Sequence, residues 1–155
     1  MSLESVRQFF AEHAPEITII ELAESTATVD LAAKAHNVEP GQIAKTLSLK
    51  VKDRVVLVVT RGDARLDNRK LKQTLGAKAR MLNSDEVVTW TGHPVGGVCP
   101  FGLENPLTVY CDVSLRDFPE VMPAAGAIHS AVRITPDYMA ELTGAEWVDV
   151  CQQTG

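Results

Sequence analysis

Lys45 stands at the start of a predicted strand, directly after a helix and a Pro-Gly turn, in the segment Gly41–Leu47 (GQIAKTL). Because side chains alternate between the two faces of a strand, Lys45 shares a face with Leu47 and Leu49, which we expect to face the core. An ammonium group that points inward is costly unless an anion or several acceptors lie nearby. Lys45 therefore either turns outward, pairs with a structural carboxylate, or binds an anionic group of a ligand.

The Gly- and Pro-rich segment Gly92–Gly102 (GHPVGGVCPFG) is the second candidate for chemistry. Gly96 and Gly97 can adopt positive φ and bring amide N–H groups close to a ligand, and two prolines stiffen the turn around them. Such a loop suits a carbonyl or carboxylate oxygen, or a terminal ribose, that needs fixed donors. A loop of this composition is also common as a purely structural connection. Together with Lys45 it predicts a pocket in which the lysine and the glycine loop lie side by side.

His129 follows the small residues Gly126 and Ala127, just before a predicted strand. Small residues leave room beside the ring, so His129 either lines a pocket or is an ordinary surface or core histidine. Cys99 with His129 is an alternative catalytic pair, since a thiolate beside an imidazole can attack esters. A metal site is not expected, because the available ligands lack the short paired spacings of zinc sites; these ligands are His93, Cys99, Cys111 and His129.

The size and composition of the chain predict a single domain spanning residues 1–155. With 155 residues, 45% of them hydrophobic, the chain can fill one core but not comfortably two. No segment approaches the roughly 20 apolar residues needed to cross a bilayer, and the N-terminal region lacks the apolar core of a signal peptide. Three cysteines without Cys-x-x-Cys spacing argue against a disulfide framework. We therefore expect a cytoplasmic protein without a membrane partner.

The net charge of -5 conceals a segregation of charge along the chain. Residues 45 to 80 hold eleven of the fifteen Lys and Arg residues and only three Asp, so this basic segment carries +8 and the remainder -13. Lys and Arg release counterions from phosphates, so the basic segment could dock RNA. Charge alone equally fits a solvated helix face and hairpin that keep the protein soluble.

Apolar periodicity, capping residues and turn residues predict an alternating order of helices and strands. Helices are expected at residues 3–13, 28–35, 67–75 and 84–90, and from Pro136 to Gly144. Strands are expected at residues 17–22, 44–51, 54–60 and 108–112, around 121, and at 131–134 and 147–150. A tight turn around Lys52 and Asp53 joins two of these strands into a hairpin.

These segments resemble the YbaK/ProX family of free-standing aminoacyl-tRNA deacylases, which is related to the editing domain inserted in bacterial prolyl-tRNA synthetases. The family's Gln-Ile-x-Lys-Thr-Leu pattern falls on residues 42–47, its Gly-Asp on 62–63, and its Gly-x-x-x-Gly-Gly-Val-Ser-Pro-Phe-Gly on 92–102. The resemblance covers roughly residues 26–147, with one departure, because Cys99 stands where the family has serine. It implies a mixed α/β fold, a compact domain with helices around a curved, largely antiparallel sheet.

The resemblance also implies an activity, which is hydrolysis of the ester that joins a misattached amino acid to the 3′-terminal adenosine of tRNA, assisted by the substrate and without a cofactor or metal. It places the family's essential lysine on Lys45. The residues that it implies for substrate binding are Thr26, Thr46, Gly96, Gly97, Val98, Cys99, Pro100, Gly126 and His129.

The partner implied by the resemblance is the acceptor end of a mischarged tRNA, with a small amino acid on tRNA-Pro or a related tRNA; DNA is not expected. The tRNA is recognised either through its acceptor stem, for instance by the basic segment, or by a synthetase partner. The alternative function is a noncatalytic module that binds tRNA ends or aminoacyl-nucleotides and regulates another process.

Overall fold

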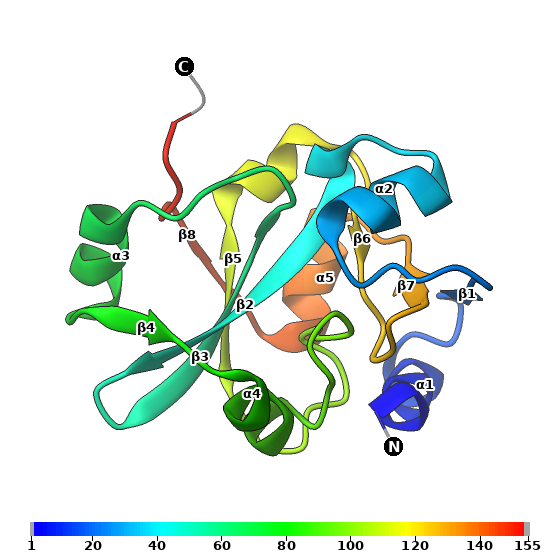
Figure 1. Cartoon of the computed structure of the whole chain (residues 1–155), viewed down its shortest axis with the longest axis horizontal. Helices are drawn as coiled ribbons and strands as arrows, with labels where there is room; N and C mark the ends of the chain where they lie inside the picture. The colour runs from blue at the N-terminus through cyan, green and yellow to red at the C-terminus, as the bar shows by residue number, and fades with distance from the viewer. Residues whose placement is uncertain (1, 154–155) are drawn as a thin grey trace.

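A six-stranded mixed sheet with helices on both faces organises the chain in the computed structural model, which describes residues 2–153 (Figure 1). Its strands run in the order β4-β2-β3-β5-β8, and β6 pairs with one end of β2. A separate two-stranded sheet joins β1 and β7. The strands are β1 (Ile19–Glu21), β2 (Ile43–Val51), β3 (Arg54–Arg61), β4 (Ala79–Met81), β5 (Thr108–Asp112), β6 (Met122–Pro123), β7 (Ser130–Val132) and β8 (Glu146–Val148). The helices are α1 (Ser2–His13), α2 (Val29–His36), α3 (Asn68–Leu75), α4 (Ser84–Thr91) and α5 (Pro136–Thr143), with short 3-10 turns η1 (Pro40–Gln42) and η2 (Val113–Asp117).

The longest ladder of the sheet is the predicted hairpin of β2 and β3, which pair antiparallel from Ala44 and Arg61 to Val51 and Arg54. The turn between them contains Lys52 with a positive φ of 54°. β4 also pairs antiparallel with β2, whereas β6, β5 and β8 add parallel pairings. The expected mixed α/β domain is therefore confirmed, and its sheet combines an antiparallel hairpin with parallel neighbours.

Strand β3 is buried on both faces, as its continuous apolar run VVLVV requires. Val56 and Val58 pack in one cluster with Leu71 and Leu75 of α3. Their neighbours Leu57 and Val59 face the other side, where Val6 and Phe10 of α1 and Met139 of α5 complete the main core. The sheet thus separates a side packed by α3 from a side packed by α1, α4 and α5.

The predicted capping residues define the helix ends. The Thr28 side chain accepts a hydrogen bond from Leu31 N at the start of α2, and Asn37 ends this helix with a φ of 57°. Gly92 ends α4 and Gly144 ends α5, both in the left-handed conformation that favours glycine. Among the described residues, no helix is long and apolar enough to cross a membrane.

Strand β2 has an open stretch on one edge. β6 pairs with residues 43–44 of β2, and β4 pairs with residues 49–51 of the same strand. Between them, the Ser48 carbonyl accepts a hydrogen bond from Leu82 N on this edge. Because main-chain groups alternate between the two edges of a strand, the N–H and C=O of Thr46 also point to the open edge. The fold thereby exposes main-chain and side-chain groups of β2 to a neighbouring space.

Candidate functional site

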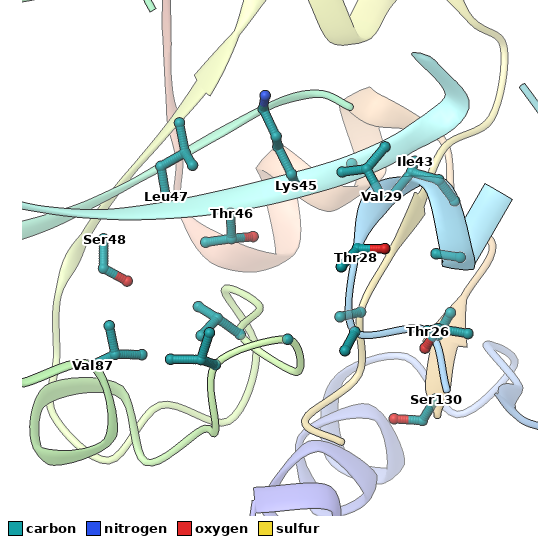
Figure 2. Close-up of a pocket in the computed structure, with 18 of the residues that line it drawn as sticks. Thr26, Thr28, Val29, Ile43, Lys45, Thr46, Leu47, Ser48, Val87 and Ser130 are labelled. Atoms are coloured by element: carbon teal, nitrogen blue, oxygen red, sulfur yellow. The ribbon is translucent and has the colours of Figure 1, made fainter. Parts of the chain in front are cut away.

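A cleft of about 480 Å³ occupies the space beside the open edge of β2. One wall is β2 from Ile43 to Ser48, a second is the face of α2 that carries Val29, Ala32 and His36, and a third is the start of α4. The loops around residues 95–98 and 124–131 complete the lining (Figure 2). Five of the residues predicted from the sequence line this cleft: Thr26, Lys45, Thr46, Gly96 and Val98.

Gly97 joins two loops behind the cleft wall. Gly126 N donates a hydrogen bond to Gly97 O at 3.0 Å, and Gly97 N donates to Pro94 O at 2.9 Å. A Cβ at position 97 would lie only 2.8 Å from Ala127 N, so the close contact of the loops requires glycine here. The Gly97 amide is thus used within its own turn, and Gly97 and Gly126 shape the wall from outside the lining. Pro100 is not among the lining residues.

Cys99 and His129 do not form the alternative catalytic pair. The Cys99 side chain is fully buried in the core, with its Sγ 3.6 Å from both His93 Nε2 and Phe101 O. Burial raises the pKa of the Cys99 thiol to about 12, so the thiol is protonated at neutral pH. His129 is half-exposed on the surface, where its Nε2 lies 3.9 Å from Glu21 Oε1. Residues 2–153 contain no cluster of three His, Cys, Asp or Glu side chains that could hold a metal.

The Lys45 ammonium lacks an ionic partner in the described part of the chain. Its Nζ donates a hydrogen bond to the neutral carbonyl Ala64 O at 2.5 Å. The neighbouring carboxylate Asp63 is held by Arg61, whose Nε lies 2.6 Å from Asp63 Oδ1. Burial lowers the pKa of the half-buried Lys45, and Arg65 lowers it further, against the attraction of Cys151 and Asp63. Such a charge is costly to the fold and is available to an anionic ligand.

The two faces of β2 present different groups to the cleft. Figure 2 shows Lys45 and Leu47 on one side of the β2 ribbon, and Thr46 and Ser48 on the other. Lys45 therefore lies on the α3 side, near Ala64, while Gly96 lines the cleft from the opposite side of the strand. The structure brings the lysine and the glycine loop to one cleft, but the ammonium does not point at the loop.

Sequence reasoning gave no role to Ser48 and His36, which line the cleft with polar atoms. Ser48 Oγ, Thr46 Oγ1 and His36 Nε2 are buried and have no hydrogen-bond partner among residues 2–153. Burial, with help from Arg133, lowers the pKa of His36, which favours the neutral ring. Strand alternation puts Ser48 on the same face as Thr46, and His36 follows Val29 and Ala32 at helical spacing. The two periodicities therefore indicate that Ser48 and His36 face the same space as the predicted site residues.

Comparison with known proteins gives consistent matches. The model of the aminoacyl-tRNA editing domain matches residues 23–142. The uncharacterized protein YwhH of Bacillus subtilis (strain 168) is 47% identical over 154 residues, which are 98% of either chain. The proline–tRNA ligase of Desulforamulus reducens is 35% identical over 122 residues, covering 76% of this chain but only 20% of the ligase. A crystal structure described as a candidate trans-editing enzyme for prolyl-tRNA synthetase superimposes with a TM-score of 0.91 at 33% identity, covering 98% of each chain.

Proposed function

The chain belongs to the aminoacyl-tRNA editing domain family, and from this premise we propose that it is an aminoacyl-tRNA deacylase that acts in trans. Its proposed substrate is a mischarged tRNA, with a small amino acid on tRNA-Pro or a related tRNA, and the proposed compartment is the cytoplasm. Editing of this kind is needed because a synthetic site separates amino acids that differ by one methylene by only about 1 to 3 kcal/mol.

The observation that carries the proposal is the half-buried ammonium of Lys45 at the edge of the cleft, which donates to the neutral Ala64 O and has no ionic partner among residues 2–153. The 3′ end of a tRNA brings phosphates and an ester whose carbonyl oxygen becomes negative as water attacks. A fixed positive charge that the protein does not neutralise stabilises either group. Arg65, exposed beside Lys45, adds positive charge on the same side of β2. Lys45 is therefore the proposed electrostatic residue of the reaction.

The proposed reaction is hydrolysis without a protein nucleophile. Water adds to the ester carbonyl, the bond between the acyl carbon and the ribose oxygen breaks, and the ribose oxygen takes up a proton. The amino acid leaves as a free carboxylate. The neighbouring ribose hydroxyl of the substrate is the proposed aid to the attacking water, because no activated thiol or hydroxyl of the protein is present in the described part of the cleft lining.

Iodoacetamide is expected to leave deacylation unchanged, because all three cysteines are buried and burial raises the pKa of each thiol to about 12. Rates measured before and after one hour with the reagent at pH 7.5 should agree within about twofold. The variant Cys99→Ser, which restores the hydroxyl of the family pattern, serves as the control and should also remain active. Loss of turnover on alkylation, together with an inactive Cys99→Ser protein of normal stability, would favour the thiol mechanism instead.

A noncatalytic module that binds tRNA ends is the alternative, and the basic segment favours it as much as it favours an enzyme. Of its cations, Arg61, Lys70 and Arg80 form ion pairs, whereas Arg69 and Lys72 lie exposed on α3. Filter binding of tRNA at rising salt, run beside a deacylation time course, tests the two functions. A deacylase releases amino acid well above the spontaneous rate of ester hydrolysis. Steep salt dependence of binding without any release would support the binding module and contradict the enzyme.

A further inference from the structure

Thr46 and Ser48 present two hydroxyl groups to the cleft that the fold does not use. Both side chains lie on the cleft side of β2 (Figure 2). Ser48 is only 4% exposed, and neither Ser48 Oγ nor Thr46 Oγ1 has a hydrogen-bond partner among residues 2–153. Buried polar atoms are nearly always paired in folded proteins, so two unpaired hydroxyls on one strand face need an explanation.

Three other hydroxyls of the cleft lining do have structural partners. Thr26 Oγ1 donates to Ile128 O at 2.9 Å, and Thr28 Oγ1 accepts from Leu31 N at 3.1 Å. Ser130 Oγ donates to Ala127 O at 3.4 Å. These three groups hold loops and a helix end in place. The pair on β2 differs from them because its hydroxyls are left for a ligand.

The surroundings of the pair define the chemistry of that ligand. Val87 of α4, Leu82 and Val98 pack together beside Ser48 and make this end of the cleft apolar. The described lining holds no Asp, Glu or Arg. The side chain of its one lysine, Lys45, projects from the face of β2 opposite to Thr46 and Ser48. A charged group would lack a counterion here, so the matching ligand group is small, neutral and polar.

We propose that Thr46 and Ser48 are specificity-determining residues that hydrogen-bond a hydroxyl group on the side chain of the esterified amino acid. This inference rests on the proposed deacylase function. It makes serine or threonine, rather than an aliphatic amino acid, the preferred esterified amino acid of the substrate. Residues two apart on a strand are neighbours on one face. A substrate hydroxyl between them can donate to one hydroxyl and accept from the other.

The direction of the selectivity follows from the unpaired hydroxyls. An apolar pocket rejects an added hydroxyl only weakly, whereas a site built to bond a hydroxyl rejects the analogue that lacks it by as much as about 10⁴-fold. With an aliphatic amino acid bound, the two hydroxyls would stay unpaired and buried. With serine or threonine bound, they would gain a partner.

Binding of two matched substrate analogues tests the inference without requiring turnover. The analogues are 3′-amino-3′-deoxyadenosine carrying, through a stable amide, either L-serine or L-2-aminobutyrate, which replaces the hydroxyl by a methyl group of similar size. By calorimetry, the wild-type protein should bind the seryl analogue at least about tenfold more tightly. Ser48→Ala and Thr46→Val should each reduce this ratio markedly, with Ser48→Ala bringing it to within about threefold. Ser84→Ala, an exposed serine of the same cleft, is the matched control and should leave the ratio unchanged.

Three outcomes would overturn the inference. The wild-type protein could bind both analogues equally, or it could bind neither. Alternatively, Ser48→Ala could weaken the binding of both analogues by the same factor, which would mean that the hydroxyls contact the adenosine that both analogues share. Failure of the deacylase function is distinguishable, because a protein that prefers the seryl analogue but releases no amino acid from tRNA would retain the hydroxyl recognition and lose only the enzymatic role.

Discussion

Replacement of Lys45 by methionine is expected to lower the single-turnover rate of deacylation by at least about 10²-fold while leaving the melting temperature unchanged or higher. The rate falls because methionine keeps the length of the side chain but removes the charge that stabilises the developing oxyanion or a bound phosphate. The stability of the folded state is not reduced, because burial lowers the pKa of Lys45. The folded chain thus holds this proton less tightly than the unfolded chain, and at neutral pH the charge destabilises the folded state. Rates at enzyme excess and thermal unfolding measure the two effects.

Lys50→Met is the matched control for this experiment, because Lys50 lies on the same strand and the substitution removes the same charge from its other face. Its deacylation rate should stay within about threefold of the wild type. A Lys45→Met protein with wild-type rate would show that the lysine has no role in the reaction. Loss of rate with an equally large loss of stability would instead identify Lys45 as a structural residue.

Replacement of Gly97 by alanine is expected to lower deacylation at least about tenfold and to destabilise the fold by about 1 to 3 kcal/mol. The added Cβ would lie 2.8 Å from Ala127 N and 2.9 Å from Gly126 C, both of which are main-chain atoms that cannot rotate away. The loops that meet through the hydrogen bond from Gly126 N to Gly97 O must separate, and the cleft wall at Gly96 and Val98 moves with them. Deacylation rates and denaturant unfolding give both quantities.

Gly144→Ala separates the local effect from a general loss of stability. Gly144 ends α5 with a φ of 66°, and a Cβ there would have no atom within 4 Å. The free energy of unfolding of this variant should therefore fall by about 1 kcal/mol, because alanine disfavours the left-handed conformation, and its deacylation rate should stay unchanged. If Gly97→Ala is as active as Gly144→Ala, the contact of the two loops does not shape the site.

Most of the fold could be predicted from local signals. The apolar run of β3 and its tight turn gave the hairpin, and the caps Thr28, Gly92 and Gly144 gave the helix ends within a few residues. Strand β4 was missed because its segment Ala79–Met81 has only three residues, too few for its alternation of apolar and polar side chains to stand out from the sequence around it. The strand expected around residue 121 corresponds to the two-residue β6, but its parallel pairing with β2 is a tertiary contact that no local pattern contains.

The site was predictable in part. Strand periodicity correctly placed Lys45 opposite Thr46, but the partner of its ammonium, Ala64 O, comes from a loop that only the tertiary fold brings near. The inward position of Cys99 and the outward position of His129 likewise depend on how two loops pack. Strand alternation places Ser48 on the same face as Thr46, but the open edge of β2 depends on where the pairings with β4 and β6 end, which no local pattern shows.

The decisive experiment for the deacylase function mixes the wild-type protein in excess with tRNA-Pro that carries radiolabelled alanine, serine or proline, and follows the release of each amino acid. We expect release of at least one small mischarged amino acid far faster than spontaneous hydrolysis, with correctly charged prolyl-tRNA spared. Release of none of them above the spontaneous rate, from a folded protein that still binds the tRNA, would contradict it.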